Sequence, residues 1–153
     1  MSGWAIRPMT PQDVDATLAM RAQTRENAMS LAELEAEYGV TPETAAEALR
    51  TCQSGWLCER DGGVIGFCVG DRVTGEVVVL AILPDDEGRG LGKALLLRVH
   101  ACLAAAGHRR AWLWANPDPE VRASGFYAHM GYLPQGTGPG GDLRLECDLA
   151  RAP

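Results

Sequence analysis

Hydrophobic and polar positions follow two periods along the chain, and the change from one period to the other separates strands from helices. Residues 4–9 read as a short edge strand that Pro8 ends. Helices are then expected after three capping signals: Thr10-Pro11, Ser30-Leu31-Ala32-Glu33 and Thr41-Pro42-Glu43-Thr44. The N-terminal third is therefore predicted to be one strand followed by two or three short helices.

Apolar runs with strand character replace the helical pattern from Ser54 onward. The runs 55–59 and 64–69 are separated by Arg60-Asp61-Gly62-Gly63, and an Asp-Gly pair between two such runs predicts a hairpin. Residues 76–83 are apolar at both odd and even positions after Glu76, which is typical of a central strand covered on both faces. The middle of the chain is thus predicted to contribute consecutive strands.

The longest predicted helix covers residues 90–106 and ends at Gly107. Its apolar stripe recurs every four residues and consists of Leu91, Leu95, Val99 and Leu103. Later elements are expected to be a strand at 111–115, a helix at 119–130, a flexible glycine loop at 136–141 and a last strand at 143–147. Together these elements predict one α+β domain over residues 1–153, with a mixed, largely antiparallel sheet flanked by helices.

Composition limits where the protein works and what it binds. Because the 153 residues contain no run of about 20 apolar residues and no secretory signal, we expect a cytoplasmic protein that does not bind membranes. The formal net charge of -6 gives no general attraction for nucleic acid, so any polyanion must be bound locally. The five cysteines are odd in number and lack a C-x-x-C pair, which fits neither a disulfide framework nor a zinc ribbon. Cys58, Cys68 and Cys102 are expected to pack as small apolar side chains, with a catalytic cysteine as the alternative.

The clearest chemical signal is the segment Leu83-Pro84-Asp85-Asp86-Glu87-Gly88-Arg89-Gly90-Leu91-Gly92-Lys93-Ala94, between the central strand and the longest helix. Three glycines at alternate positions remove the β-carbons around the helix N-terminus. A ligand can then reach backbone N–H groups at the positive end of the helix dipole. Arg89 and Lys93 add two cations. The pattern predicts a local site for a pyrophosphate; the alternative is a glycine-rich turn that binds nothing.

Two common nucleotide-binding loops do not fit this segment. A Walker A loop that ends at Gly92-Lys93 needs glycine at position 87 and a hydroxyl at position 94, where the chain has Glu87 and Ala94. The dinucleotide pattern G-x-G-x-x-G would need its third glycine at Lys93 or Leu95. The sequence therefore supports neither ATP nor NAD as the ligand.

The segment instead resembles the GNAT family of N-acetyltransferases. Leu80-Ala81-Ile82-Leu83-Pro84 and Glu87-Gly88-Arg89-Gly90-Leu91-Gly92 are similar to the family's L-A-V-x-P strand end and its [QR]-x-x-G-x-[GA] acetyl-coenzyme A loop. Downstream, Phe126-Tyr127-x-x-x-Gly131-Tyr132 is similar to the family's Y-x-x-x-G-[FY] signature. The departures are Glu87, where the family usually has Gln or Arg, and Glu120, where it often has Asn.

The resemblance implies a sheet that is splayed at its centre around the thioester of acetyl-CoA. It also implies which residues bind this cosubstrate: Ala81, Ile82, Leu83, Gly88, Arg89, Gly90, Leu91, Gly92 and Lys93. Backbone amides near Ile82 would supply the contact to the oxyanion, as the family does from this strand.

Acetyl transfer needs a neutral amine and a proton for the departing thiolate. By its position in the motif, Tyr127 is implied to be the acid that protonates the thiolate; the alternative is a tyrosine that only packs its helix against the sheet. Glu76 resembles the glutamate of histone-type members and is the candidate base, with a solvated strand-end carboxylate as the alternative. On a strand of period two it would share a face with Val78, Leu80 and Ile82. Glu59 and Asp71 are weaker candidates.

Two hypotheses about function follow. The first is an acetyl-CoA-dependent N-acetyltransferase that acts on a primary amine by direct transfer and without a metal; the second is a non-catalytic acetyl-CoA-binding sensor or partner-binding module. The acceptor, a small-molecule amine or a protein amine, stays open. A homodimer is expected by analogy, because an open sheet leaves an edge to cover.

The remaining predictions concern the histidines, the tryptophans and one N-terminal turn. The three histidines are expected at helix surfaces or helix ends: His100, His108 and His129. Most of the four tryptophans are expected to be core or half-buried anchors, and one is a candidate to line an acceptor cleft: Trp4, Trp56, Trp112 and Trp114. Arg25-Glu26-Asn27 is placed where family members contact the acceptor, with a solvated turn as the default interpretation.

Overall fold

The computed structural model describes residues 3–24, 29–117 and 122–150. Its elements, in chain order, are β1 (Trp4–Pro8), α1 (Val14–Arg21), α2 (Leu31–Tyr38), α3 (Pro42–Thr51), β2 (Gln53–Arg60), β3 (Gly63–Asp71), β4 (Val77–Ile82), α4 (Leu91–Ala105), β5 (Arg110–Ala115), α5 (Arg122–His129), β6 (Leu133–Thr137) and β7 (Leu143–Asp148). Within these residues no helix combines the length and apolar character that a membrane span requires.

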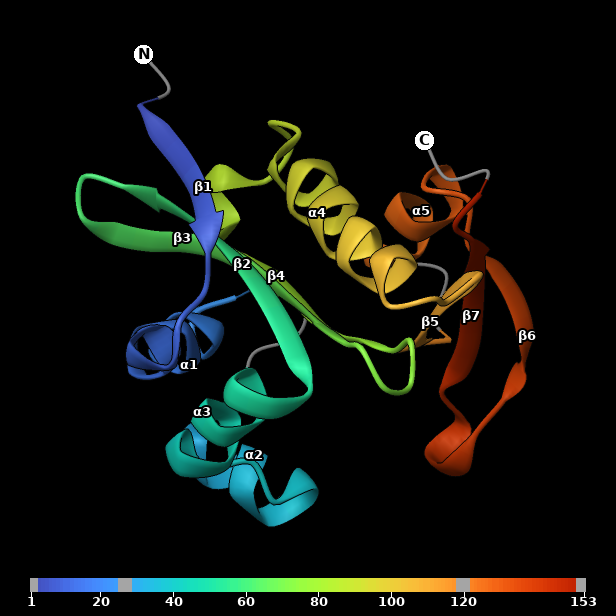
Figure 1. The fold of residues 1–153 in the computed structure, drawn as a ribbon, viewed down its shortest axis with the longest axis horizontal. Coiled ribbons are helices and arrows are strands. Elements are labelled where there is room, and N and C mark those ends of the chain that lie inside the picture. Colours follow the sequence, from blue (N-terminus) through green and yellow to red (C-terminus); the bar gives the residue numbers. More distant parts are fainter. Residues whose placement is uncertain (1–2, 25–28, 118–121, 151–153) are drawn as a thin grey trace.

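The strands form two antiparallel sheets that touch at one point. The first has the order β1-β2-β3-β4 and the second the order β5-β7-β6. An isolated parallel bridge joins Glu76 to Trp112, whose N–H donates to the carbonyl of Gly75 at 3.2 Å. In Figure 1, α4 and α5 lie on one side of the strands and α1, α2 and α3 on the other. The expected mixed, largely antiparallel sheet that is splayed at its centre is therefore confirmed, with the splay between β4 and β5.

The N-terminal helices begin where the capping signals predict. Ser30 and Thr41 accept hydrogen bonds from the N–H groups of Glu33 and Thr44, respectively, and Gly39 ends α2 in the left-handed conformation. The first helix differs, because Thr10 is followed by a short 3-10 turn before α1 begins at Val14.

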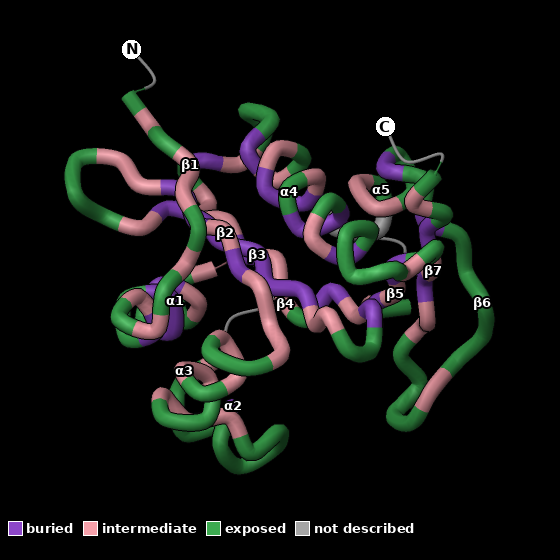
Figure 2. The backbone as a smooth tube through the Cα atoms, in the orientation of Figure 1, coloured by how far each residue is buried: buried purple, intermediate pink, exposed green. Residues whose placement is uncertain are grey.

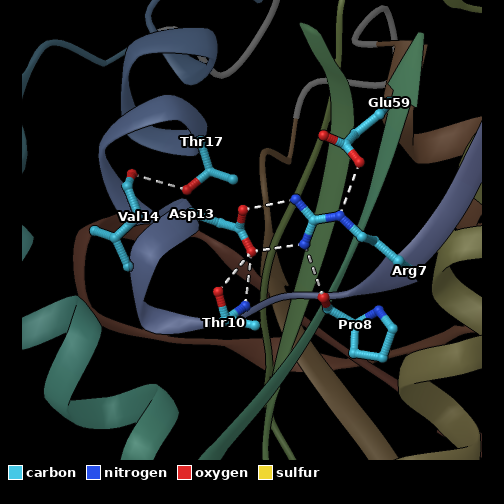
Figure 3. A network of polar contacts seen from close by, with 7 residues as sticks. All are labelled: Arg7, Pro8, Thr10, Asp13, Val14, Thr17 and Glu59. Atoms are coloured by element: carbon cyan, nitrogen blue, oxygen red, sulfur yellow. Dashed lines mark hydrogen bonds and ion pairs between the residues drawn. The ribbon is translucent and has the colours of Figure 1, made fainter. Parts of the chain in front are cut away.

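An ion-pair network attaches this first helix to the sheet (Figure 3). The Arg7 guanidinium on β1 donates to both carboxylate oxygens of Asp13 at 2.8 and 2.9 Å, and through Nε to Glu59 on β2 at 2.8 Å. These hydrogen bonds lower the pKa of Asp13 to about 2, so its carboxylate stays ionised.

Strand β6 is the element that the hydrophobic pattern does not predict. All five of its residues are exposed, and the run contains Pro134 and Gly136, which are poor strand formers. It pairs with β7 through Leu133 and Glu146, and the register breaks after Pro134. Pairing with a neighbouring strand, rather than burial, therefore defines this edge.

Helix α4 lies close against β3 because glycines face it. The predicted stripe Leu91, Leu95, Val99 and Leu103 is buried throughout. A β-carbon on Gly70 would lie 2.5 Å from Cγ1 of Val99. Figure 2 shows buried backbone running along β3 and the inner side of α4. The core that supports the splay is thus set by small residues on the strand and large ones on the helix.

Replacement of Gly70 by alanine is expected to lower the free energy of unfolding by about 1–3 kcal/mol, because the added methyl group overpacks the contact with Val99. Urea unfolding measures this value. Gly63→Ala in the same strand is the matched control, since its β-carbon would lie 3.6 Å from the nearest atom. Equal stabilities of the two variants would contradict the close approach of α4.

Candidate active site

The glycine segment forms an exposed loop at the N-terminus of α4. A 3-10 turn, Pro84–Asp86, follows β4, and Gly88 and Gly90 then adopt φ of 79° and 81°. Because these values lie in the left-handed region, side chains there would strain the loop. Gly90 is the N-cap of α4 and brings no side chain over the first helical turn. The loop residues Gly88, Arg89, Gly90 and Lys93 are all exposed, so peptide groups, two cations and the positive helix end are accessible to an anion.

Strand β4 presents its open edge to the splay. The N–H of Leu83 donates to Ile65 on β3 at 2.9 Å. Since N–H groups alternate in direction along a strand, those of Leu80 and Ile82 point away from β3, toward the side where β5 diverges. The side chain of Ala81 is buried on the face of the sheet that lies opposite α4, in a cluster with Phe67 and Met20. The structure thus brings the residues 80–83 next to the glycine loop, with two backbone donors at the opening.

A bulge changes the face on which Glu76 lies. Val79 pairs with Val69 whereas Val77 pairs with Gly70, so Val78 is an extra residue in β4. Val77 accordingly packs in the same cluster as Leu80 and Ile82, beneath α4. Because Glu76 precedes Val77, its side chain is directed to the other face. The expectation that Glu76 shares a face with Leu80 and Ile82 is therefore wrong.

The carboxyl group of Glu76 is half-buried near the point where the two sheets meet. Burial and the nearby Asp71 raise its pKa, and the cation of Arg144 opposes that shift. Its bridge partner Trp112 donates through Nε1 to the carbonyl of Thr74 at 2.9 Å. Glu76 therefore has the electrostatic character of a base that ionises above the usual range of a glutamate.

Tyr127 lies on the α4 side of the splay. Its ring packs edge-to-face against Phe126 and Tyr132, with centroid distances of 5.3 and 5.5 Å. Phe126 in turn lies 3.5 Å from the β-carbon position of Gly92, so α5 packs on the first turn of α4. Burial strongly raises the pKa of the Tyr127 hydroxyl, and Cys68 on β3 adds to this. The phenol therefore stays protonated at neutral pH.

A buried histidine, which was not predicted from the sequence, supports this aromatic cluster. His100 is 5% exposed, and its Nε2 lies 2.6 Å from the hydroxyl of Tyr132. The expectation that His100 lies on a helix surface is wrong, because Leu96 and His100 form a second buried line on α4, one turn apart. Burial lowers the pKa of His100 to about 4. His129 ends α5 as expected, whereas His108 lies in the loop between α4 and β5.

On the face opposite α4, aromatic and charged side chains gather beside Glu76. The Arg144 guanidinium lies 4.0 Å from the ring centroid of Trp112 and 6.0 Å from that of Trp114, and its Nε donates to Glu146 at 2.8 Å. Trp112 is half-buried as expected, but Trp114 is 40% exposed and is no core anchor. Residues in a parallel bridge point to the same side, which places Glu76 and Trp112 on one surface.

The remaining predicted positions are the cysteines, the two glutamates that depart from the family pattern and the N-terminal turn. All five cysteines are free. Cys58 and Cys68 are buried as expected, whereas Cys102 is only half-buried and Cys147 is buried as well. Glu87 is half-buried at the start of the glycine loop. Glu120 and the segment Arg25-Glu26-Asn27 lie outside the described residues.

Comparison with known proteins agrees with this geometry. Residues 52–134 match the family model described as an acetyltransferase (GNAT) domain. A mycothiol acetyltransferase of Beutenbergia cavernae is 37% identical over 84 residues, which cover 52% of this chain and 28% of that protein. An uncharacterised N-acetyltransferase of Mycobacterium bovis is 36% identical over 80 residues, covering 50% of this chain and 51% of the relative. The chain thus spans about a quarter to a half of the length of these relatives.

Solved structures share the fold over nearly the whole chain. The PaiA N-acetyltransferase of Thermoplasma acidophilum, solved in complex with coenzyme A, superposes with a TM-score of 0.77 at 18% identity and covers 95% of this chain and 98% of its own. An N-acetyltransferase of Staphylococcus aureus gives a TM-score of 0.75 at 19% identity, with coverage of 97% and 99%. The fold is that of the acetyltransferases. This chain belongs to the GNAT acetyltransferase family.

Proposed function

We propose that the protein is an N-acetyltransferase that moves an acetyl group from acetyl-CoA to a primary amine by direct transfer. The observation that carries this proposal is the exposed glycine loop at the N-terminus of α4, adjacent to the opening between β4 and β5. Phe126, the neighbour of Tyr127 on α5, packs on the first turn of the same helix. Acetyl-CoA supplies an activated acetyl thioester when it is bound. The chain's own residues would bind it, orient it and move protons.

The glycine loop fits the diphosphate of this cosubstrate. Gly88, Arg89, Gly90, Leu91, Gly92 and Lys93 offer peptide N–H groups and two exposed cations, and the left-handed glycines leave the backbone uncovered. Residues 81–83 would bind the arm that carries the thioester, and the outward N–H of Ile82 would stabilise negative charge on the carbonyl oxygen. Tyr127 would donate its proton to the departing thiolate.

The amine would approach from the face that carries Glu76. An amine with a pKa of about 10.4 is neutral in roughly one of 2,500 molecules at pH 7, so a base or a desolvated environment must help. Glu76 is half-buried on that face, next to Trp112 and the exposed Trp114. The acceptor is accordingly proposed to be a small-molecule or protein amine that contacts this aromatic surface.

Three broader expectations stay proposals: that residues 1–153 form a single acetyltransferase domain, that the protein works in the cytoplasm and that it forms a homodimer. The edge strand β6, which pairs only with β7 and is exposed along its length, supports the last of these.

Calorimetry with acetyl-CoA, followed by thiol release across an amine panel, tests the proposed function. We expect binding that saturates at one site and thiol release that depends on an amine. Binding without acetylation of any amine would favour the non-catalytic sensor, for which the carboxylate of Glu87 beside the loop is the supporting observation. An absence of binding would overturn both hypotheses.

Glu76→Gln is expected to remove the acidic limb of the pH profile of kcat/KM and to lower activity at neutral pH by roughly 100-fold or more. The reason is that the raised pKa of Glu76 makes its ionisation visible above the usual glutamate range. Glu47→Gln, in an exposed ion pair with Arg50, is the control and should retain the profile. An unchanged acidic limb in Glu76→Gln would assign the base to another group.

A further inference from the structure

An ion pair between a buried carboxylate and a partly exposed guanidinium lies at the start of the glycine loop. Asp86 closes the 3-10 turn that precedes the loop, and its side chain is 3% exposed, which makes it the one fully buried carboxylate among the described residues. Arg60, the last residue of β2, donates to it from its two terminal guanidinium nitrogens: Nη1 to Oδ1, and Nη2 to Oδ2 at 3.3 Å. The hairpin of β2 and β3 is thereby connected to the start of the loop.

Burial makes this contact obligatory. A buried carboxylate without a partner is strongly destabilised, so removing Arg60 would force Asp86 to move toward water or take up a proton. Either response shifts the turn that begins the loop. The other end of the loop is fixed by Leu91, which is 2% exposed. The exposed stretch from Gly88 to Gly90 is therefore held between two buried anchors.

The charge of Asp86 also matters for the ligand. Its carboxylate lies in the turn just ahead of the peptide groups that are proposed to bind a diphosphate, and two anions repel each other most in a poorly solvated place. The guanidinium of Arg60 neutralises that carboxylate. With Asp86 neutralised, the exposed cations Arg89 and Lys93 offset the remaining carboxylates of the segment, Asp85 and Glu87, and attract the diphosphate.

We propose that Arg60 is a positioning residue for cosubstrate binding. Through its ion pair with Asp86 it fixes the start of the glycine loop and neutralises the carboxylate there, and in this way it sets the affinity for the diphosphate of acetyl-CoA. This inference rests on the proposed function. Arg60 acts through Asp86 and is not assigned a contact with the reacting atoms.

The test compares acetyl-CoA with acetyl-pantetheine, which carries the thioester but lacks the diphosphate. In Arg60→Gln we expect the Kd and KM for acetyl-CoA to rise roughly 10- to 100-fold, the range of coupling through a charged pair. kcat at saturation and the KM for acetyl-pantetheine should stay within about twofold. The double variant Arg60→Gln/Asp86→Asn, which removes both charges, should bind acetyl-CoA within about threefold of the unmodified protein.

Controls separate this role from a general loss of structure. Arg50→Ala breaks an exposed ion pair and should leave every constant unchanged. An unchanged Kd for acetyl-CoA in folded Arg60→Gln, or an equal rise in both KM values, would overturn the inference. If Arg60→Gln does not fold, Arg60→Lys replaces it, with an expected rise of roughly fivefold because a lysine cannot reproduce the two-point contact; an unchanged Kd there overturns the inference too.

The experiments distinguish an error in the proposed function from an error in the role of Arg60. If the unmodified protein does not bind acetyl-CoA, the function itself is wrong. If the unmodified protein binds acetyl-CoA and transfers acetyl groups while Arg60→Gln behaves identically, only the role of Arg60 is wrong.

Discussion

Tyr127→Phe is expected to lower turnover by roughly 10- to 1,000-fold while the Kd for acetyl-CoA stays within a few-fold of its original value. The substitution removes the proton that the phenol holds and keeps the ring that packs between Phe126 and Tyr132. A departing thiolate, with a thiol pKa of about 8.5, gains from a nearby acid most at pH values below that figure. Rates of thiol release at saturating substrate measure the effect.

Two features sharpen this experiment. Tyr38→Phe is the matched control, because Tyr38 is 68% exposed on α2 and should leave turnover unchanged. A cosubstrate with a more acidic thiol should lose less rate in Tyr127→Phe than acetyl-CoA does, since its thiolate leaves without help. If turnover is unaffected in Tyr127→Phe, the tyrosine has only the packing role.

Local sequence signals were sufficient to predict much of the fold. The caps at Ser30 and Thr41 satisfy the helix N-terminus with neighbouring residues, so they act the same way in any tertiary setting. The stripe on α4 is predictable for a similar reason, because its spacing alone defines one helix face. The glycine loop also follows from the sequence, since left-handed turns at Gly88 and Gly90 need no distant partner.

What could not be predicted depends on contacts between distant segments. The bulge at Val78 arises from the register between β3 and β4, and it is this single extra residue that turns Glu76 to the opposite face. Likewise, Arg144 meets Trp112 only because β5 and β7 are paired. The sequence therefore identified Glu76 and Tyr127 as candidates but not the surfaces on which they lie.

Tyr127 and Glu76 lie on opposite sides of the opening between β4 and β5. Tyr127 belongs to the buried aromatic cluster on the α4 side, whereas Glu76 belongs to the half-buried surface beyond the bulge. An acid and a base on opposite sides can act on a leaving group and an attacking amine, respectively, without neutralising each other. The pKa values of both groups are raised, which keeps the phenol protonated and makes the Glu76 carboxylate a stronger base than an exposed glutamate.

Stability should fall as the pH is lowered from about 6.5 to about 4, and His100 is expected to account for about 3 kcal/mol of that fall. In the unfolded chain His100 binds a proton near pH 6.5, whereas burial lowers its pKa in the folded protein to about 4. Between these values the unfolded state binds more protons, so acid favours unfolding. The cause is visible in the structure, because Nδ1 is buried without a hydrogen-bond partner among the described residues, while Nε2 lies 2.6 Å from the hydroxyl of Tyr132.

Urea unfolding of His100→Gln between pH 4 and 7 isolates this contribution. The variant should be less stable at neutral pH and should lose about 3 kcal/mol of the pH dependence, whereas His129→Gln, at an exposed position of α5, should keep it. Glu76, whose raised pKa acts in the opposite direction, is present in both variants and cancels in the comparison. Asp13 has a pKa of about 2 in the folded protein, so it affects stability mainly below about pH 4, and it too is present in both variants. If His100→Gln retained the full slope, the histidine would have to be charged in the folded protein, and the neutral pair with Tyr132 beneath Tyr127 would be wrong.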